Sequence, residues 1–129
     1  MDDEQLTRQL SADRQQAQDT RTQLEHFAKR FSRMTIEDGY RVSRAWVALQ
    51  LTQGRRVIGH KIGLTSRAMQ QASQNDEPDY GTTRDSMLFP CTPGPVRDIP
   101  DARCIAPRVE GELAFGPKDP AQGPTVTRG

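Results

Sequence analysis

The 129-residue sequence predicts an α+β fold, in which two helical stretches precede several short strands. Apolar residues recur at helical spacing within residues 3–31 and again within residues 36–51. Residues 57–64 read as a short strand interrupted by glycines, and residues 107–115 as a strand that begins after a proline. The expected organisation is a helical region over 1–54, an α+β region over 55–115 and an irregular tail over 116–129.

Charge and hydropathy narrow the class of protein. The chain has 18 Lys and Arg against 17 Asp and Glu, for a net charge of +1, so no strong field favours nucleic acid or an anionic membrane. No apolar run approaches the roughly 18 residues of a membrane-spanning helix, and the acidic N-terminus does not resemble a signal peptide. We therefore expect a cytoplasmic protein with neither nucleic acid nor a membrane as partner.

The supply of core-forming residues is small. Hydrophobic residues make up 33% of the chain, and its mean hydropathy is -0.80, which is low for a self-sufficient core. We therefore expect the chain to associate, as a homo-oligomer. Cys91 and Cys104 form no Cys-x-x-Cys motif, so zinc and redox sites are unsupported and two free, buried thiols are expected.

The first helix is expected to cover residues 3–31. Leu6 and Leu10 lie four residues apart, as on one helical face. A second group on one face comprises Leu24, Phe27, Ala28 and Phe31. Residues 13–22 are almost wholly polar, so we expect the centre of this helix to be exposed. Packing on its own domain is the favoured role, and binding of a partner helix is the alternative.

The second helix has clear start and stop signals. Thr35 can cap its N-terminus, with Asp38 three residues later near the positive end of the helix. Gly54 is a plausible stop. The face expected from the spacing comprises Ile36, Tyr40, Ser43, Val47 and Leu51. Nothing on this helix suggests chemistry, so we expect it to be scaffold.

Lys61 is unusual within the apolar strand 57–64. Gly59 and Gly63 there indicate a bulge or a close backbone approach to a ligand. A buried lysine needs an anionic partner, so Lys61 is a candidate for holding a substrate carboxylate or moving a proton. An outward-facing edge lysine is the alternative. His60 alternates with Lys61 and is expected to be structural.

The next segment is expected to be less regular. Ser66 can cap a short helix that runs through residues 69–72. Residues 74–81 are rich in turn formers and predict a loop. Asp79 in this loop is either an active-site acid or a turn cap. Residues 85–89 predict a return to strand.

Glu110 and Glu112 carry the clearest chemical signal. The two-residue period of the strand 107–115 places both carboxylates on one side. The expected core side carries Val109, Leu113 and Phe115. Two adjacent acids repel unless a positive group lies between them, and Mg²⁺ or Mn²⁺ bound through oxygen is the simplest such group. A solvated face with two scattered acids is the alternative.

Four segments in this order resemble the hydratase and decarboxylase branch of the fumarylacetoacetate hydrolase superfamily. They are residues 35–38, 59–70, 77–81 and 107–115. The resemblance covers nearly the whole chain up to Phe115. It implies N-terminal helices followed by the start of a mixed β-roll of the superfamily's C-terminal type.

The resemblance assigns roles to particular residues. Glu110 and Glu112 stand where the family's glutamates bind Mg²⁺ or Mn²⁺. Lys61, Leu64 and Asp79 stand at substrate-binding positions, with Lys61 and Asp79 implied as catalytic. The implied metal acts as a Lewis acid on a 2-oxo acid, while Lys61 and Asp79 assist proton transfer or hold the charged ends of the substrate.

The implied reaction is the addition of water to 2-oxo-hept-4-ene-1,7-dioate in 4-hydroxyphenylacetate (homoprotocatechuate) degradation. Alternatives are a 2-oxo-3-hexenedioate decarboxylase, a 2-oxopent-4-enoate hydratase, a non-catalytic fragment or assembly partner, and a helical interaction module. Family members continue further, with a third metal-binding carboxylate and most of the β-roll downstream, whereas Gly116-Pro117 replaces the usual apolar continuation. The sequence is therefore expected to be a truncated form with an incomplete roll.

Overall fold

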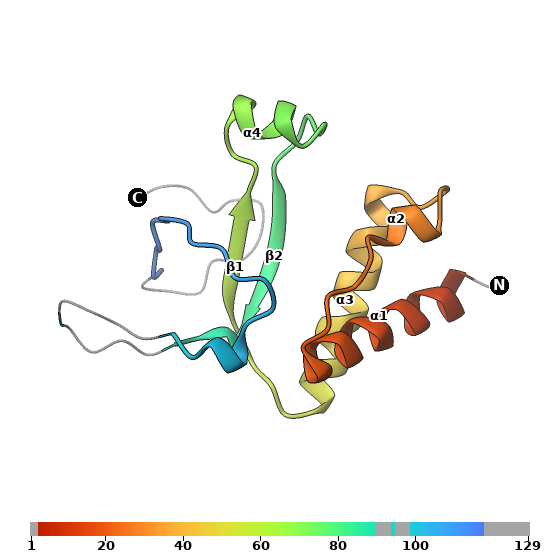
Figure 1. Ribbon diagram of the computed structural model, residues 1–129, viewed down its shortest axis with the longest axis horizontal. Helices are drawn as coiled ribbons and strands as arrows, with labels where there is room; N and C mark the ends of the chain where they lie inside the picture. The colour runs from red at the N-terminus through yellow and green to blue at the C-terminus, as the bar shows by residue number, and fades with distance from the viewer. Residues whose placement is uncertain (1–2, 90–93, 95–98, 118–129) are drawn as a thin grey trace.

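The computed structural model describes residues 3–89, 94 and 99–117. Its elements are α1 (Asp3–Thr20), α2 (Phe27–Arg30), α3 (Ile36–Thr52), β1 (Val57–Gly63), α4 (Arg67–Ala72), β2 (Asp79–Arg84) and two 3₁₀ turns (Asp85–Met87 and Asp101–Arg103). Helices α1, α2 and α3 lie beside an antiparallel ribbon of β1 and β2, and α4 lies at one end of that ribbon (Figure 1). Helices together with a small sheet agree with the expected α+β class.

The first helix is shorter than predicted. α1 ends at Thr20, where Arg21 takes the left-handed conformation at φ 53°. The N–H groups of Arg21 and Thr22 then donate to the carbonyls of Gln18 and Ala17 at 3.3 and 2.9 Å. This is the Schellman arrangement, which closes a helix and satisfies its last carbonyls. The predicted helix over 3–31 is therefore wrong, and the short α2 begins a separate turn.

The centre of α1 packs one face against α3. Gln15 Oε1 accepts hydrogen bonds from Trp46 Nε1 and Gln50 Nε2, each at 3.0 Å, and Ala17 is buried. Leu10 and the α3 residue Val42 are the other buried apolar residues of this contact. The prediction of an exposed polar centre holds for Gln16, Asp19 and Thr20, but it is wrong for the face toward α3, where hydrogen-bonded side-chain amides are partly buried.

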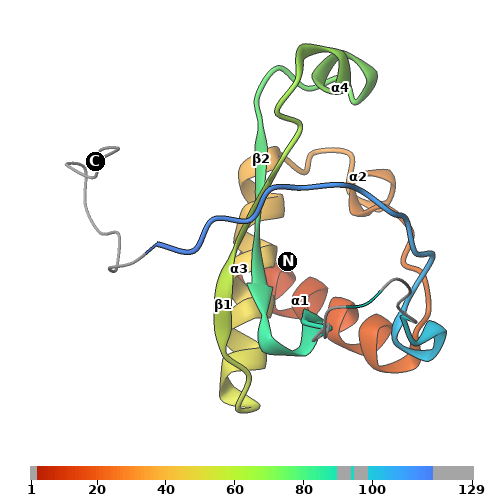
Figure 2. The ribbon, with the colours of Figure 1, turned by 90° about the vertical axis from the view of Figure 1, so that its left-hand side faces the viewer.

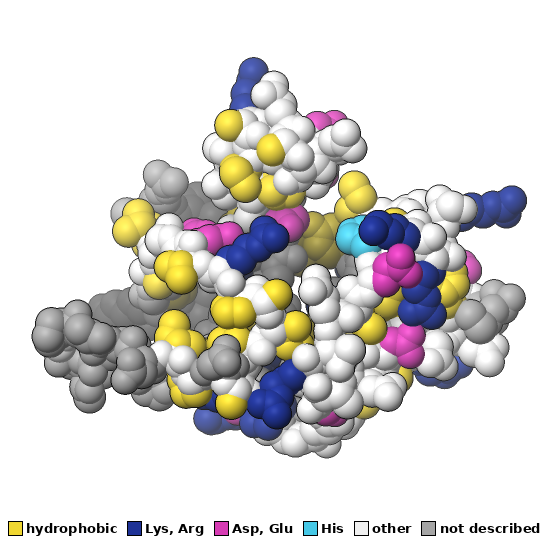
Figure 3. Space-filling model, in the orientation of Figure 1, with side chains coloured by type: hydrophobic (Ala, Val, Ile, Leu, Met, Phe, Trp, Pro, Cys, Tyr) yellow, Lys and Arg dark blue, Asp and Glu magenta, His cyan; other side chains and the backbone are white. Residues whose placement is uncertain are grey.

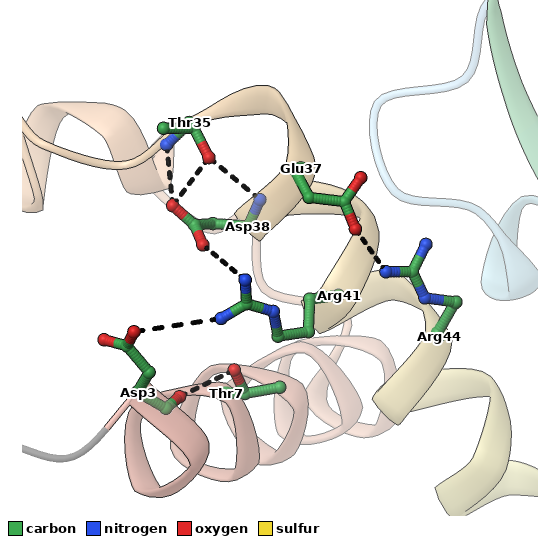
Figure 4. Close-up of polar contacts among 7 residues, drawn as sticks. All are labelled: Asp3, Thr7, Thr35, Glu37, Asp38, Arg41 and Arg44. Atoms are coloured by element: carbon green, nitrogen blue, oxygen red, sulfur yellow. Dashed lines mark hydrogen bonds and ion pairs between the residues drawn. The ribbon is translucent and has the colours of Figure 1, made fainter.

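The start of α3 was correctly predicted (Figure 4). The Asp38 N–H donates to Thr35 Oγ1 at 3.2 Å, and the Thr35 N–H donates to Asp38 Oδ2 at 2.9 Å. These two bonds form a capping box. The backbone hydrogen bond from Thr35, followed by its side-chain bond, lowers the pKa of Asp38 below its usual value. Arg41 links this helix end to Asp3 of α1, and Gly54 follows the helix at φ 82°.

The register of the ribbon confirms the predicted strand near residues 57–64 and reveals a partner strand, β2, that was not predicted. Lys61 pairs with Gly81 and Gly63 with Asp79, and the register shifts between Val57 and Gly59, where a bulge was expected. β2 begins at Asp79, inside the predicted loop.

The predicted strand over 85–89 is instead a 3₁₀ turn. The Asp85 carboxylate accepts the N–H groups of Arg56 and Ser86 at 3.2 and 3.0 Å, and these bonds turn the chain as β2 ends.

The ribbon has two unlike sides. Tyr80 stacks on Tyr40 of α3 with ring centroids 4.5 Å apart, and the Arg84 guanidinium lies 4.2 Å from the centre of the Trp46 ring. We call this the α3-facing side. Since side chains alternate along a strand, Lys61, Gly63, Asp79 and Gly81 lie on the other side, which we call the open side. In Figure 2, α3 lies behind the ribbon and the chain that follows residue 105 crosses in front of it.

Residues 107–115 form no strand. Their backbone has no ladder partner within the described ranges, because the ribbon ends with β1 and β2. The expected core residues are exposed: Val109 by 96%, Leu113 by 86% and Phe115 by 87%. The prediction that they face a core is wrong, since no described part of the chain covers them.

Two further expectations concern the cysteines and membrane-spanning helices. Cys104 is a free thiol of intermediate burial, so it is free as predicted but not fully buried. Cys91 lies outside the described residues. Among the helices of the described ranges, none combines the length and apolar character needed to cross a membrane.

Candidate functional site

Three of the predicted site residues meet on the open side of the ribbon. Lys61 Nζ donates to Glu112 Oε1 at 2.5 Å and lies 3.2 Å from Glu110 Oε2. The partner of Lys61 across the ribbon is Gly81, which has no side chain. The lysine therefore has space on this side of β1, and residues 51 positions apart in the chain converge there. We call these three residues the Lys61 cluster.

The Lys61 cluster is open to solvent. The side chains of Lys61, Glu110 and Glu112 are 49%, 62% and 56% exposed, and Figure 3 shows acidic and basic side chains next to one another at the surface beside the ribbon. The hydrogen bond to Glu112, followed by that to Glu110, raises the pKa of the Lys61 ammonium. The lysine is therefore a fixed positive charge at neutral pH. Exposed ion pairs of this kind contribute little to stability.

Asp79 lies on the same side as Lys61. It pairs with Gly63, and its carboxylate occupies the space into which a β-carbon at residue 63 would project. Lys61 and Asp79 are diagonal neighbours across the ribbon, a relation that places residues roughly 7–8 Å apart. Asp79 is thus the first residue of a strand rather than part of a loop, and Gly63 makes room for its carboxylate.

Leu64 follows β1 in a strained conformation. Its φ of 52° lies in the left-handed region, which costs a residue with a β-carbon about 1–2 kcal/mol. Its carbonyl accepts a hydrogen bond from Gln70 Nε2 at 2.8 Å, and Ser66 caps α4 by accepting the Met69 N–H at 3.3 Å. The cap at Ser66 was predicted.

The role of Gln70 was not predicted, although it lies in the motif 59–70. It connects α4 to the turn that follows β1, and so it helps to hold the backbone of the half-buried Leu64.

The donor chemistry of the Lys61 cluster suits a hard cation. Two carboxylates converge on one positively charged atom, and Mg²⁺ is commonly held by one or two carboxylates together with water and substrate oxygens. Within the described ranges, no group of three or more His, Cys, Asp or Glu is placed to hold a metal ion. Here Lys61 supplies the positive charge that the paired glutamates require, so Glu110 and Glu112 fit a divalent ion only as a partial ligand set.

Comparison with known proteins gives evidence on the family of the chain. No protein-family model matches the chain. The chain is 47% identical over 112 residues to 2-oxo-hept-4-ene-1,7-dioate hydratase of Escherichia coli, which covers 87% of this chain and 40% of that protein. It is 43% identical over 95 residues to 2-hydroxyhexa-2,4-dienoate hydratase of Comamonas testosteroni, covering 74% of this chain and 35% of that protein.

A third relative is 2-hydroxypent-2,4-dienoate hydratase of Pseudomonas putida, 35% identical over 125 residues, covering 97% of this chain and 55% of that protein. The matched part of the chain thus spans between 35% and 55% of the length of these three proteins. The chain is therefore a relative of the hydratases that are named for 2-oxo-enoate and 2-hydroxydienoate substrates.

Proposed function

We propose that the chain acts as a metal-dependent hydratase of the fumarylacetoacetate hydrolase superfamily. Its reaction would be the addition of water to 2-oxo-hept-4-ene-1,7-dioate in the cytoplasmic degradation of 4-hydroxyphenylacetate. The proposal is supported by the 47% identity to a hydratase named for this substrate. The observation that carries it is the Lys61 cluster, in which Lys61, Glu110 and Glu112 converge from distant parts of the chain.

Lys61 and Asp79 have different roles in this proposal. The Lys61 ammonium has a raised pKa and stays protonated, so it is suited to holding a substrate carboxylate and poorly suited to accepting a proton. Asp79 lies on the same side of the ribbon, and we assign to it the proton transfer that accompanies addition of water. We assign to Leu64, whose backbone is held by Gln70, a substrate-binding role beside them.

Glu110 and Glu112 are the residues that would hold Mg²⁺ or Mn²⁺. When bound, the metal supplies Lewis acidity toward the keto oxygen and carboxylate of a 2-oxo acid. The two glutamates now share the positive charge of Lys61. If a bound divalent ion neutralised the two glutamates, the Lys61 ammonium would be free to pair with an anionic substrate.

The exposed side chains of Val109, Leu113 and Phe115 favour an enzyme that works as a homo-oligomer. Large apolar side chains that gather in one segment are usually covered by a partner surface.

A second candidate substrate is 2-oxopent-4-enoate. A relative named 2-keto-4-pentenoate hydratase, from Paraburkholderia xenovorans, is 39% identical over 85 residues. This substrate has one carboxylate, whereas 2-oxo-hept-4-ene-1,7-dioate has two. A 2-oxo-3-hexenedioate decarboxylase is a further alternative and would release carbon dioxide instead of consuming water.

The test is an assay of the full chain with each of the three substrates, in the presence of Mg²⁺, Mn²⁺ or a chelator. We expect metal-dependent gain of one water, followed by mass spectrometry, with 2-oxo-hept-4-ene-1,7-dioate turned over fastest. Lys61→Met should lower kcat/KM by roughly 10- to 100-fold, which is the range for loss of a charged hydrogen bond, and it should not weaken metal binding, because it removes a cation that pairs with both glutamates.

The matched control is Arg67→Met, which removes another exposed cation from the nearby helix α4. Activity that survives in the double variant Glu110→Gln, Glu112→Gln would contradict the proposed metal site. A chain that binds Mn²⁺ weakly and turns over none of the substrates would favour the non-catalytic alternative.

A further inference from the structure

A second concentration of charge lies away from the Lys61 cluster. A cavity of about 760 Å³ is lined by four arginines from separate parts of the chain, together with Trp46 and one acid. The five charged residues are Arg21, Arg55, Arg84, Arg103 and Asp19. We call this cavity the arginine hollow. It adjoins the end of β2, about 10 Å along the strand from the partner of Lys61, and Arg84 belongs to the α3-facing side.

Arg84 is the most deeply buried charge of the arginine hollow. Its residue is 3% exposed, and its guanidinium carbon lies 4.2 Å from the centre of the Trp46 ring. Nη1 donates to the Thr82 carbonyl at 3.2 Å, but Nε has no hydrogen-bond partner among the described residues. A buried donor without a partner is costly, and the flat guanidinium directs its remaining donors within its own plane.

Arg21 and Arg103 are held in place without being neutralised. Arg21 donates to the Ala102 carbonyl, and Arg103 donates to the Ser86 carbonyl. These backbone acceptors orient the two guanidinium groups but carry no full charge to offset theirs.

Acidic groups near the arginine hollow are already engaged. Within the described ranges, no carboxylate lies within 4.0 Å of a charged nitrogen of Arg21, Arg55, Arg84 or Arg103. Asp19 accepts a hydrogen bond from Gln15 Nε2 at 2.9 Å. Asp85 is close enough to Arg55 for that arginine to contribute to lowering its pKa, but its carboxylate also accepts two backbone N–H groups.

We propose that the arginine hollow is a binding site for a small organic anion that carries two or more carboxylates. Guanidinium groups match carboxylates through paired, charge-assisted hydrogen bonds. The volume of the hollow suits a metabolite better than a single inorganic ion. The exposed Arg21, Arg55 and Arg103 supply the donors, and the bound carboxylates offset the buried positive charge of Arg84. This site is independent of the chemistry proposed for the Lys61 cluster.

The test is titration of the full chain with citrate by isothermal calorimetry. Arg55→Gln and Arg103→Gln should each weaken citrate binding about tenfold or more, and rising salt should weaken it further. Arg67→Gln on α4 is the matched control and should bind like the parent chain. Arg55→Gln and Arg103→Gln are used because Arg84→Gln alters a buried residue and can disturb folding.

Three outcomes would overturn the proposal. One is the absence of citrate binding. Another is equal weakening in Arg67→Gln and Arg55→Gln, which would indicate nonspecific charge attraction. A third is loss of citrate binding in Lys61→Met with no effect of Arg55→Gln, which would place the anion at the Lys61 cluster. Sedimentation of the same variants identifies a competing occupant, since loss of self-association in Arg55→Gln without citrate binding would mean that a second copy fills the hollow.

Discussion

The two sides of the β1–β2 ribbon are built differently although they share the same strands. On the α3-facing side, Tyr80 and Arg84 are fixed by ring contacts with Tyr40 and Trp46. On the open side, Lys61 is held only by carboxylates that are themselves exposed. Ring contacts therefore fix the side chains on the α3-facing side, whereas exposed charges set the position of Lys61 on the open side. A side chain held by solvent-exposed charge can be drawn away by a ligand, which a packed side chain resists.

The largest expected effect is on the α3-facing side. Trp46→Ala removes the ring that contacts Arg14 and Arg84 and the hydrogen bond to Gln15. We expect the free energy of unfolding to fall by about 2–4 kcal/mol, below the full range for a buried tryptophan because Trp46 is half-buried. Urea unfolding measures the change. Phe115→Ala is the control, since its exposed ring predicts a change within about 0.5 kcal/mol; equal losses in both variants would contradict the contrast between the two sides.

A smaller effect is expected where the ribbon supports the site. Gly63→Ala places a methyl group where the Asp79 carboxylate now lies, so Asp79 has to move or the strands have to separate. Because Asp79 is exposed and its carboxylate can rotate away, we expect the main effect on turnover, with kcat/KM lower by about tenfold, and a loss of no more than about 1 kcal/mol in unfolding free energy. The control is Gly81→Ala, because an added β-carbon there meets nothing within 4 Å. If Gly81→Ala lowered kcat/KM as much as Gly63→Ala, the close approach of Asp79 to residue 63 would not be the cause.

The smallest effect concerns the capping box, which belongs to neither side of the ribbon. Thr35→Ala should lower stability by about 1 kcal/mol. The pKa of Asp38 is lowered in the folded chain by its hydrogen bonds to Thr35, so its contribution is present above the usual aspartate pKa of about 3.9 and is lost as pH falls through the lowered value. Thermal unfolding between pH 7 and pH 2 checks this: the difference in Tm between the parent chain and Asp38→Asn should shrink as the pH falls. A constant difference would contradict it.

Local signals in the sequence predicted local structure well. The helix start at Thr35, the bulge near Gly59 and the cap at Ser66 are confirmed because each depends on residues within a few positions. The end of α1 was missed because Arg21, rather than a glycine, takes the left-handed position. β2 was missed because Thr82 and Thr83 follow a run of turn-forming residues that predicted a loop.

The long-range part of the site was harder to predict. The sequence indicated Lys61 and the pair Glu110 and Glu112 as chemically unusual, but it did not reveal that the ammonium would lie between the two carboxylates. Likewise, residues 107–115 have the composition of a strand, yet a strand also requires a neighbour to pair with, and the sequence of the segment does not supply one. The site roles of these residues stay predictions.

A ribbon of two strands has a consequence for assembly. Within the described residues, each strand is hydrogen-bonded to one neighbour, so both β1 and β2 are edge strands with one outer row of backbone N–H and C=O groups. Such an edge is a template on which a further strand can be added, from the same molecule or from another. Growth of the sheet from either edge would enlarge the open side, on which Lys61 and Asp79 lie, without disturbing the contacts with α3.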